Sequence, residues 1–277
     1  MILEARSIKE KIITDLKDQV TNLTLKPKLV VIQVGDNPAS NTYIRNKSKM
    51  CEKVGYTFEL KKYPETITQD KLLEDINNLN LDISVNAILV QMPLPKHLDE
   101  LLIQNSINPI KDVDGLTDLN MGKLSHNKDT LYPCTAIGII ELLDHYNLPI
   151  TGKHVVIVGR SNLVGKPVAS LFLNRNATIT HCHSYTKNLK DLTKEADILV
   201  VAAGIPNLIT KDMVKENSII IDVGINKVGD TLTGDVDFNS IKDKVQAITP
   251  VPGGVGQMTV AELAKNILKA YNYQQNK

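Results

Sequence analysis

The sequence predicts an α/β protein made of two domains. Runs of β-branched and apolar residues, bounded by turn residues, alternate along the chain with segments of helical periodicity. This alternation is typical of parallel strands that are buried on both faces. At 277 residues the chain is also near the length at which a single core tends to divide into two.

The first half of the chain provides one set of elements. Its apolar runs predict strands at residues 28–35, 57–63 and 86–92. Segments with apolar residues at helical spacing predict helices at residues 2–20, 40–54, 68–79 and 98–105.

The second half provides a larger set of strands, at residues 154–159, 178–183, 197–203, 218–224 and 246–251. Between the sets, residues 133–153 predict a helix that ends before Pro149, and we expect the hinge between the domains there. A last helix is expected at about 258–272, closing the chain against one of the domains. The predicted domains are residues 1–147 with 262–277, and residues 148–261.

Composition restricts the classes of partner. Lys and Arg number 32 and Asp and Glu 31, so the balance gives no reason to expect nucleic acid or an anionic membrane as a partner. No apolar run approaches the ~20 residues that span a bilayer, and the N-terminus lacks the apolar region of a signal peptide. The cysteines Cys51, Cys134 and Cys182 are widely scattered and odd in number. We therefore expect a cytoplasmic protein without a metal site.

A turn after the first strand of the second set predicts a dinucleotide site. The strand at 154–159 ends in a turn with Gly159, Ser161 and Gly165, and this turn opens a helix. Such a turn lets backbone N–H groups and the helix N-terminus face a pyrophosphate. Because the spacing is GxSxxxG rather than GxGxxG, a tight turn without a ligand is the alternative interpretation.

The neighbouring strand ends favour the dinucleotide interpretation. The next strand leads into Ser184 and Lys187, without the acidic residue that would bind a ribose 2′-hydroxyl. Strand ends at 202–204 and 223–226 add small residues to the same edge. We therefore expect a Rossmann-like, doubly wound domain that binds NADP in preference to NAD. Alternatively, Lys187 and Arg160 are solvated surface cations.

The helix expected at 40–54 carries a lysine on its apolar side. Lys47 lies three residues from Ile44 and four from both Tyr43 and Cys51, so these side chains share one side of the helix. Apolar surroundings disfavour the charged ammonium and can ready the amine for proton transfer near neutral pH. The alternative is that the Lys47 side chain extends along the edge of the apolar stripe to water.

Polar residues at strand ends and turns accompany Lys47. Gln91 lies near the end of the strand at 86–92, and Asp114 lies in the turn KDVDGL. Taken singly, Gln91 would be a satisfied strand-end amide and Asp114 a turn or cap residue. Together with Tyr43 and Lys47, they predict a reactive site in the first domain.

These segments, with TPVPGGVGQMTVAEL at 249–263, closely resemble the methylenetetrahydrofolate dehydrogenase/cyclohydrolase family. The resemblance covers essentially the whole chain in order, through VGDNPASNTYIRNKSK, VQMPLP, KDVDGL, PCTAIG, GRSNLVGKP, IDVGIN and PVPGGVGQMT. It implies that 5,10-methylenetetrahydrofolate is oxidised with NADP and that the methenyl product is hydrolysed to 10-formyltetrahydrofolate, in a cleft between the domains. It also implies one-carbon supply for purine and formyl-group biosynthesis, and it suggests a homodimer.

The resemblance further assigns residues to roles. Lys47 resembles the family's catalytic lysine, Gln91 the residue that tunes it, and Asp114 the acid that binds the pterin ring. Tyr43, an aromatic wall over the folate, completes this catalytic set. The substrate site would also include Ser40, Pro252, Gly253 and Gly254. The implied cofactor-site residues are Thr135, Gly159, Arg160, Ser161, Gly165, Ser184 and Ile225.

Two residues depart from the family pattern, and two other functions stay open. Gln257 and Ala136 stand where the family usually or often has proline, which leaves the rigidity of these loops in question. A two-domain oxidoreductase acting on a hydroxy acid, in which Lys47 binds a substrate carboxylate, is one alternative. A nucleotide-sensing module whose first domain only binds a partner is the other.

Overall fold

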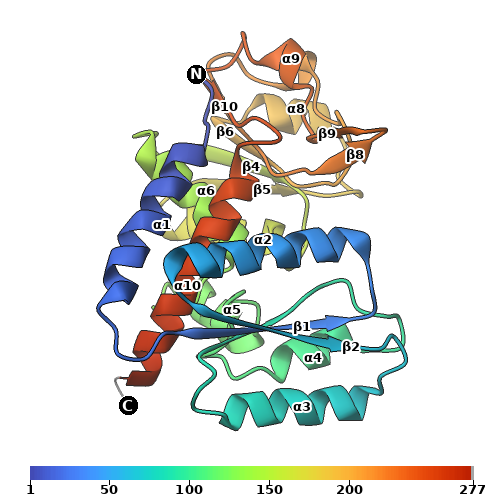
Figure 1. Cartoon of the computed structure of the whole chain (residues 1–277). Coiled ribbons are helices and arrows are strands. Elements are labelled where there is room, and N and C mark those ends of the chain that lie inside the picture. The colour runs from blue at the N-terminus through green and yellow to red at the C-terminus, as the bar shows by residue number, and fades with distance from the viewer. Residues whose placement is uncertain (276–277) are drawn as a thin grey trace. The chain divides into compact units, whose positions relative to one another are not determined.

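The computed structural model describes residues 1–275 and divides into two compact units (Figure 1). The three-strand unit comprises Glu10–Lys123, Lys128–Cys134 and the segment from Val260 onward. The five-strand unit comprises Met1–Lys9, Leu124–Asn127 and Thr135–Thr259. Residues 276–277, which end the predicted range 262–277, lie outside the described residues.

The three-strand unit is built on a parallel sheet in the order β2-β1-β3. Its strands are β1 (Lys28–Val34), β2 (Thr57–Tyr63) and β3 (Ala87–Val90). Its helices are α2 (Pro38–Val54), α3 (Gln69–Leu81), α4 (Glu100–Asn105) and α5 (Asp118–Ser125), with most of α1 (Arg6–Thr21) and α10 (Val255–Gln275).

Apolar residues cover both faces of this sheet. Alternate residues of β1 divide between two buried clusters: Leu29 and Val31 pack with α1, α2 and α10, whereas Val30 and Ile32 pack with α3 and α4. Figure 1 shows α2 and α3 on opposite faces of the sheet. Successive side chains of a strand point to opposite faces, so an uninterrupted apolar run fits a sheet that is buried on both sides.

The five-strand unit is a parallel sheet in the order β10-β7-β6-β4-β5. Its strands are β4 (His154–Val158), β5 (Thr178–Cys182), β6 (Ile198–Val201), β7 (Ile219–Asp222) and β10 (Ala247–Ile248). Chain order runs outward from β4 in both directions, through β5 on one side and β6 on the other. In doubly wound sheets, ligands bind at the carboxyl ends of the strands beside such a switch point. The predicted α/β class with a Rossmann-like domain is confirmed.

The five-strand unit also contains helices, a 3₁₀ helix and a two-stranded hairpin. They are α7 (Gly165–Asn174), α8 (Leu189–Lys194), the 3₁₀ helix η1 (Lys211–Met213), α9 (Phe238–Ile241) and the hairpin of β8 (Asn226–Val228) and β9 (Thr231–Thr233), together with most of α6 (Cys134–His145). The sequence predicted the helix after the Gly159 turn and the helix within 133–153. It did not predict α5, α8, α9, η1 or the hairpin.

The predicted first helix, at residues 2–20, is wrong at its start. The helix α1 begins at Arg6 because the residues before it run beside β10. The N–H of Leu3 donates to the carbonyl of Ile248 at 2.9 Å. A backbone that is paired with a strand cannot also form helical hydrogen bonds.

The compact units also have other limits than the predicted domains. Residues 1–9 and most of α6 belong to the five-strand unit, although the sequence division grouped them with the first domain. The assignment of residues 1–147 with 262–277 to folate binding and of residues 148–261 to cofactor binding remains a prediction. No helix within residues 1–275 is long and apolar enough to cross a membrane.

Candidate active site

A hydrogen bond between Lys47 and Gln91 forms the centre of the candidate site in the three-strand unit. Nζ of Lys47, on α2, donates to Oε1 of Gln91 at 2.9 Å. Gln91 follows β3 directly, and its backbone N–H extends the ladder to Ile32 of β1. Its own Nε2 donates to the carbonyl of Met92 at 2.8 Å, which leaves Oε1 turned toward the lysine. The end of β3 therefore fixes the acceptor that receives the amine.

Burial shifts the protonation equilibrium of Lys47 toward the neutral amine. The side chain is half-buried, and burial lowers the pKa of its ammonium, while the charge of Asp114 opposes this shift. Desolvation disfavours a charged group, and a neutral amide such as Gln91 does not restore that charge. The arrangement can thus accept a proton closer to neutral pH than an exposed lysine can.

Asp114 lies in a turn that a second aspartate holds in place. Asp112 is fully buried, and its carboxylate accepts hydrogen bonds from Gln104, Gly115, Thr117 and Asn120. Asp114 itself is half-buried; burial raises the pKa of its carboxyl, and Lys47 lowers it. Asp112 therefore fixes the backbone of the turn, and Asp114 stands beside the lysine without an equivalent set of partners.

Residues far along the sequence complete the surroundings of Asp114. Nδ2 of Asn266, on α10, donates to the carbonyls of Val113 and Tyr132 at 2.9 and 2.8 Å. The thiol of Cys134 donates to the carbonyl of Val113 at 3.3 Å. Neither Asn266 nor Cys134 is among the site residues predicted from the sequence. The PCTAIG segment was a signal for Cys134, whereas Asn266 lies in an amphipathic helix that shows no local motif.

Ser40 and Tyr43 occupy the first turns of α2, ahead of Lys47. Ser40 is 4% exposed, and its hydroxyl donates to the carbonyl of Met92, the residue after Gln91. Tyr43 is 48% exposed and lies one helical turn before Lys47. Its ring is thus available to a flat ligand beside the amine. The predicted residues Pro252, Gly253 and Gly254 belong to the five-strand unit, in the turn that precedes α10.

The turn between β4 and α7 is shaped for close backbone approach. Gly159 has φ +124, and a Cβ on Gly165 would lie 2.0 Å from the Gly159 carbonyl oxygen. Val164, the N-cap of α7, makes no side-chain capping bond, while Ser161 Oγ accepts from the Val164 N–H at 3.1 Å. The N–H groups of Val164 and Lys166 both bond to Ser161, and Pro167 has none, so the α7 N-terminus offers the Gly165 N–H and the positive end of the helix dipole to a pyrophosphate.

The other predicted cofactor residues belong to the five-strand unit, and all but Thr135 lie at neighbouring strand ends. Cζ of Arg160 lies 5.4 Å from the ring centroid of Tyr185, which is not among the residues predicted for the site. Ser184 is exposed, and Ile225 is 50% exposed. Thr135, at the start of α6, has its hydroxyl 3.2 Å from that of Thr259. Gly159, Ser184 and Ile225 thus follow the carboxyl ends of β4, β5 and β7, along one edge of the sheet.

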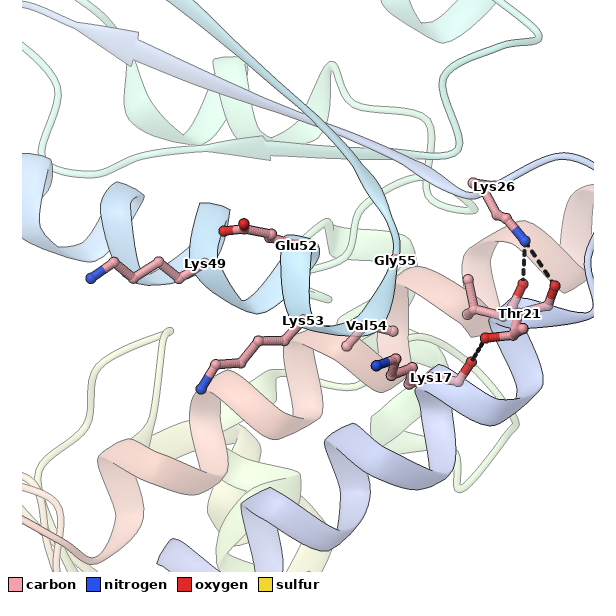
Figure 2. A pocket seen from close by; sticks show the side chains of 9 residues that line it. Lys17, Thr21, Lys26, Lys49, Glu52, Lys53, Val54 and Gly55 are labelled. Atoms are coloured by element: carbon pink, nitrogen blue, oxygen red, sulfur yellow. Dashed lines mark hydrogen bonds between the residues drawn. The ribbon is translucent and has the colours of Figure 1, made fainter.

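A pocket of about 700 Å³ lies elsewhere in the three-strand unit, at the C-terminal ends of α1 and α2 (Figure 2). Its lining residues are Lys17, Val20, Thr21, Lys26, Lys49, Glu52, Lys53, Val54 and Gly55. Lys26 donates to the carbonyls that end α1. Figure 2 shows Lys17, Lys49 and Lys53 pointing apart rather than toward one point. These cations suit the negative ends of two helices, and none of the predicted site residues lines the pocket.

Comparison with known families covers both halves of the chain. Residues 3–114 match the catalytic domain of tetrahydrofolate dehydrogenase/cyclohydrolase, and residues 133–275 match the NAD(P)-binding domain of the same family. The chain belongs to the tetrahydrofolate dehydrogenase/cyclohydrolase family. This membership confirms the predicted bifunctional oxidoreductase and hydrolase with a nicotinamide dinucleotide cofactor.

Individual members of the tetrahydrofolate dehydrogenase/cyclohydrolase family are similar along their whole length. The bifunctional protein FolD of Bacillus anthracis is 49% identical over 274 residues, which cover 98% of this chain and 96% of the relative. The crystal structure of FolD from Campylobacter jejuni is 45% identical, with a TM-score of 0.97 and 99% of each chain covered. The Trypanosoma brucei enzyme, solved with NADP and an inhibitor, is 34% identical, with a TM-score of 0.95 over 100% of this chain and 99% of that one.

Proposed function

We propose that Lys47 is the proton-transfer residue of this methylenetetrahydrofolate dehydrogenase and methenyltetrahydrofolate cyclohydrolase. The observation that carries the proposal is the hydrogen bond of 2.9 Å from its amine to Gln91, in surroundings that lower the pKa of the ammonium. Water that adds to the methenyl carbon must lose a proton, and a neutral amine at that place accepts it.

Binding of the folate falls to the residues around the amine. The Asp114 carboxyl is suited to accept hydrogen bonds from the amino and ring N–H groups of a pterin. Tyr43 offers an exposed ring face beside Lys47, and buried Ser40 fixes the start of the same helix. In this proposal the substrate enters the oxidation step already oriented, and orientation is the main requirement of hydride transfer.

The cofactor proposed for the five-strand unit is NADP in preference to NAD. When bound, it accepts a hydride from the methylene carbon of the folate. The Gly165 N–H and the positive end of α7 suit its pyrophosphate, and Arg160 and Ser184 suit a ribose 2′-phosphate. The segment THCHSYTK contains no Asp or Glu, which would repel that phosphate. The NADP complex of the Trypanosoma brucei relative supports the same choice.

Two further features are part of the proposal. We expect a homodimer, because the resemblance to the family suggests one. We also expect a cytoplasmic location, since Cys51, Cys134 and Cys182 are all free and buried, as in proteins of a reducing compartment.

The proposed function is tested by adding methylenetetrahydrofolate to the purified protein with NADP or NAD. We expect reduction of NADP, followed by conversion of the methenyl product to the formyl compound. Supplying the methenyl compound without a nucleotide measures the hydrolysis by itself. A protein that reduces NAD faster than NADP would contradict the cofactor choice, and one that leaves the methenyl compound intact would contradict the role of Lys47.

A further inference from the structure

Two buried aspartates hold the strand ends of the five-strand unit together. Asp222 ends β7 and is 3% exposed, and Asp235 follows the hairpin β8–β9 and is fully buried. The Asp235 N–H donates to Oδ1 of Asp222 at 3.0 Å, and Oδ2 of Asp222 accepts the N–H of Val236 at 3.0 Å. The two residues are thus linked directly, at the edge of the sheet where the predicted cofactor residues lie.

Asp235 joins two segments at the carboxyl edge of the sheet, residues 202–204 after β6 and residues 223–226 after β7, which together with the turn after β10 are called the rim. Its Oδ2 accepts the N–H groups of Ala203 and Gly204 at 2.6 and 2.9 Å, and both residues follow the end of β6. Its Oδ1 accepts Nδ2 of Asn226 at 2.8 Å, in the segment that follows β7. The two oxygens therefore set the spacing between the strand ends 202–204 and 223–226.

Asp222 extends the arrangement to a third segment. Its Oδ1 also accepts the N–H of Gly224 at 3.0 Å, and its backbone N–H donates to the hydroxyl of Thr249 at 2.7 Å. Thr249 begins the turn that carries Pro252 and Gly253. The two carboxylates therefore hold the segments after β6 and β7, and the backbone of Asp222 joins the third segment, after β10.

Two glycines make room for the carboxylates. A Cβ on Gly224 would lie 2.1 Å from Oδ1 of Asp235, and one on Gly234 would lie 1.8 Å from Oδ2 of Asp222. Ile225, which the family resemblance implies for the cofactor site, stands between Gly224 and Asn226, two residues that the carboxylates hold. The backbone is thus held by the carboxylates on both sides of Ile225.

From this geometry we infer that Asp235 is a positioning residue for the nicotinamide cofactor: it sets the rim at the ends of β6 and β7 without touching the reacting atoms. The inference rests on the proposed function, since it requires that this rim bind the cofactor. Asparagine in its place has the same shape but only one acceptor oxygen. Its NH₂ group therefore faces either the backbone N–H groups of Ala203 and Gly204, which cannot exchange roles, or the Asn226 amide, which must turn over to present its oxygen. Either arrangement replaces charge-assisted hydrogen bonds with weaker ones and loosens the link between the two strand ends.

The test is the substitution Asp235→Asn, with steady-state kinetics for both activities. We expect KM for NADP to rise about tenfold, with a smaller change in kcat, and hydrolysis of methenyl compound supplied without nucleotide to stay within about twofold. Asn226→Ala removes only one partner of Asp235, and we expect about a threefold rise in KM. This second variant decides the question if Asp235→Asn does not fold.

Asp237→Ala is the matched control in the same segment. Asp237 caps α9 by accepting the N–H of Ser240, so its loss lowers stability without changing a partner of the rim. We expect a lower Tm and an unchanged KM for NADP. An unchanged KM in Asp235→Asn or, if that variant does not fold, in Asn226→Ala would overturn the inference, as would an equal rise in Asp237→Ala. A wild-type protein that does not reduce NADP would instead overturn the proposed function.

Discussion

The amine of Lys47 and the side-chain oxygen of Gln91 are 2.9 Å apart, although 44 residues separate them in the sequence. The partner is a neutral amide, so this hydrogen bond holds the lysine without adding a charge that would favour its protonated form. The same hydrogen bond thus positions the amine and leaves its pKa free of an added partner charge.

Replacing Gln91 with glutamate should therefore shift the pH dependence of hydrolysis. A carboxylate beside the amine stabilises the ammonium and raises its pKa, so the neutral base forms only at higher pH. We expect the rising limb of kcat against pH to move upward by about one unit or more in Gln91→Glu. Gln91→Leu removes the hydrogen bond without adding charge and serves as the control. If the two variants had the same pH profile, the electrostatic role of Gln91 would be wrong.

Asp114→Asn should weaken folate binding and slow both activities. The amide pairs less well with the amino and ring N–H groups of the pterin than the carboxylate does. Hydrogen bonds to charged groups contribute about 1.5–3 kcal/mol, which corresponds to roughly one to two powers of ten in affinity. The measurement is the dissociation constant of a folate ligand, and a value equal to that of the wild type would leave Asp114 as a turn residue only.

Cofactor choice should depend on Arg160 and, through it, on Tyr185. Arg160→Ala removes the cation proposed for the 2′-phosphate, and we expect the ratio of kcat/KM for NADP over NAD to fall by about tenfold or more. Tyr185→Ala removes the ring that lies 5.4 Å from the guanidinium, and we expect a smaller fall in the same ratio. Tyr185→Phe keeps the ring and is the control. A ratio that does not change in Arg160→Ala would make Arg160 a solvated surface cation.

Glu262 should make the stability of the protein depend on pH. This residue of α10 is 2% exposed, and its Oε1 has no hydrogen-bond partner among residues 1–275. Burial raises the pKa of its carboxyl to about 8, so the folded protein keeps a proton that the unfolded chain loses at about pH 4.3. Stability is therefore full below the unfolded pKa and decreases as pH rises toward the folded one.

Glu262→Gln isolates this contribution, because the amide does not ionise. Each pKa unit corresponds to about 1.4 kcal/mol, so we expect the variant to gain on the order of 5 kcal/mol relative to the wild type between about pH 4 and pH 9. The measurement is the difference in Tm between the two proteins across this range. Nζ of Lys265 lies 3.3 Å from the other carboxyl oxygen. A difference that stays constant with pH would show that this ion pair compensates for the buried charge.

The sequence predicted the sheets because their strands are continuous apolar runs. The runs at 28–35 and 154–159 correspond to β1 and β4 within one residue. The helix α9 and the strand β8 have 4 and 3 residues, too few for a period to be recognised. The start of α1 could not be predicted, since the pairing of Leu3 with Ile248 joins opposite ends of the chain.

Those residues of the candidate site that lie within a recognisable sequence motif could be predicted. Lys47, Gln91 and Asp114 each lie in a segment that resembles the family. The pair formed by Asp222 and Asp235 was not found, although both residues were visible as acids near strand ends. Only the fold shows that their carboxylates are buried and that backbone N–H groups surround them.

The most direct test of the account is the pair of activities of Lys47→Met. Methionine suits the apolar side of α2, so the variant should fold, and it removes the only group that we propose as proton acceptor. We expect hydrolysis of the methenyl compound to fall by about 10²-fold or more, while NADP-dependent oxidation falls far less, since hydride transfer depends on orientation. Near-normal hydrolysis in Lys47→Met, with the fold intact, would contradict the proposed role of this lysine.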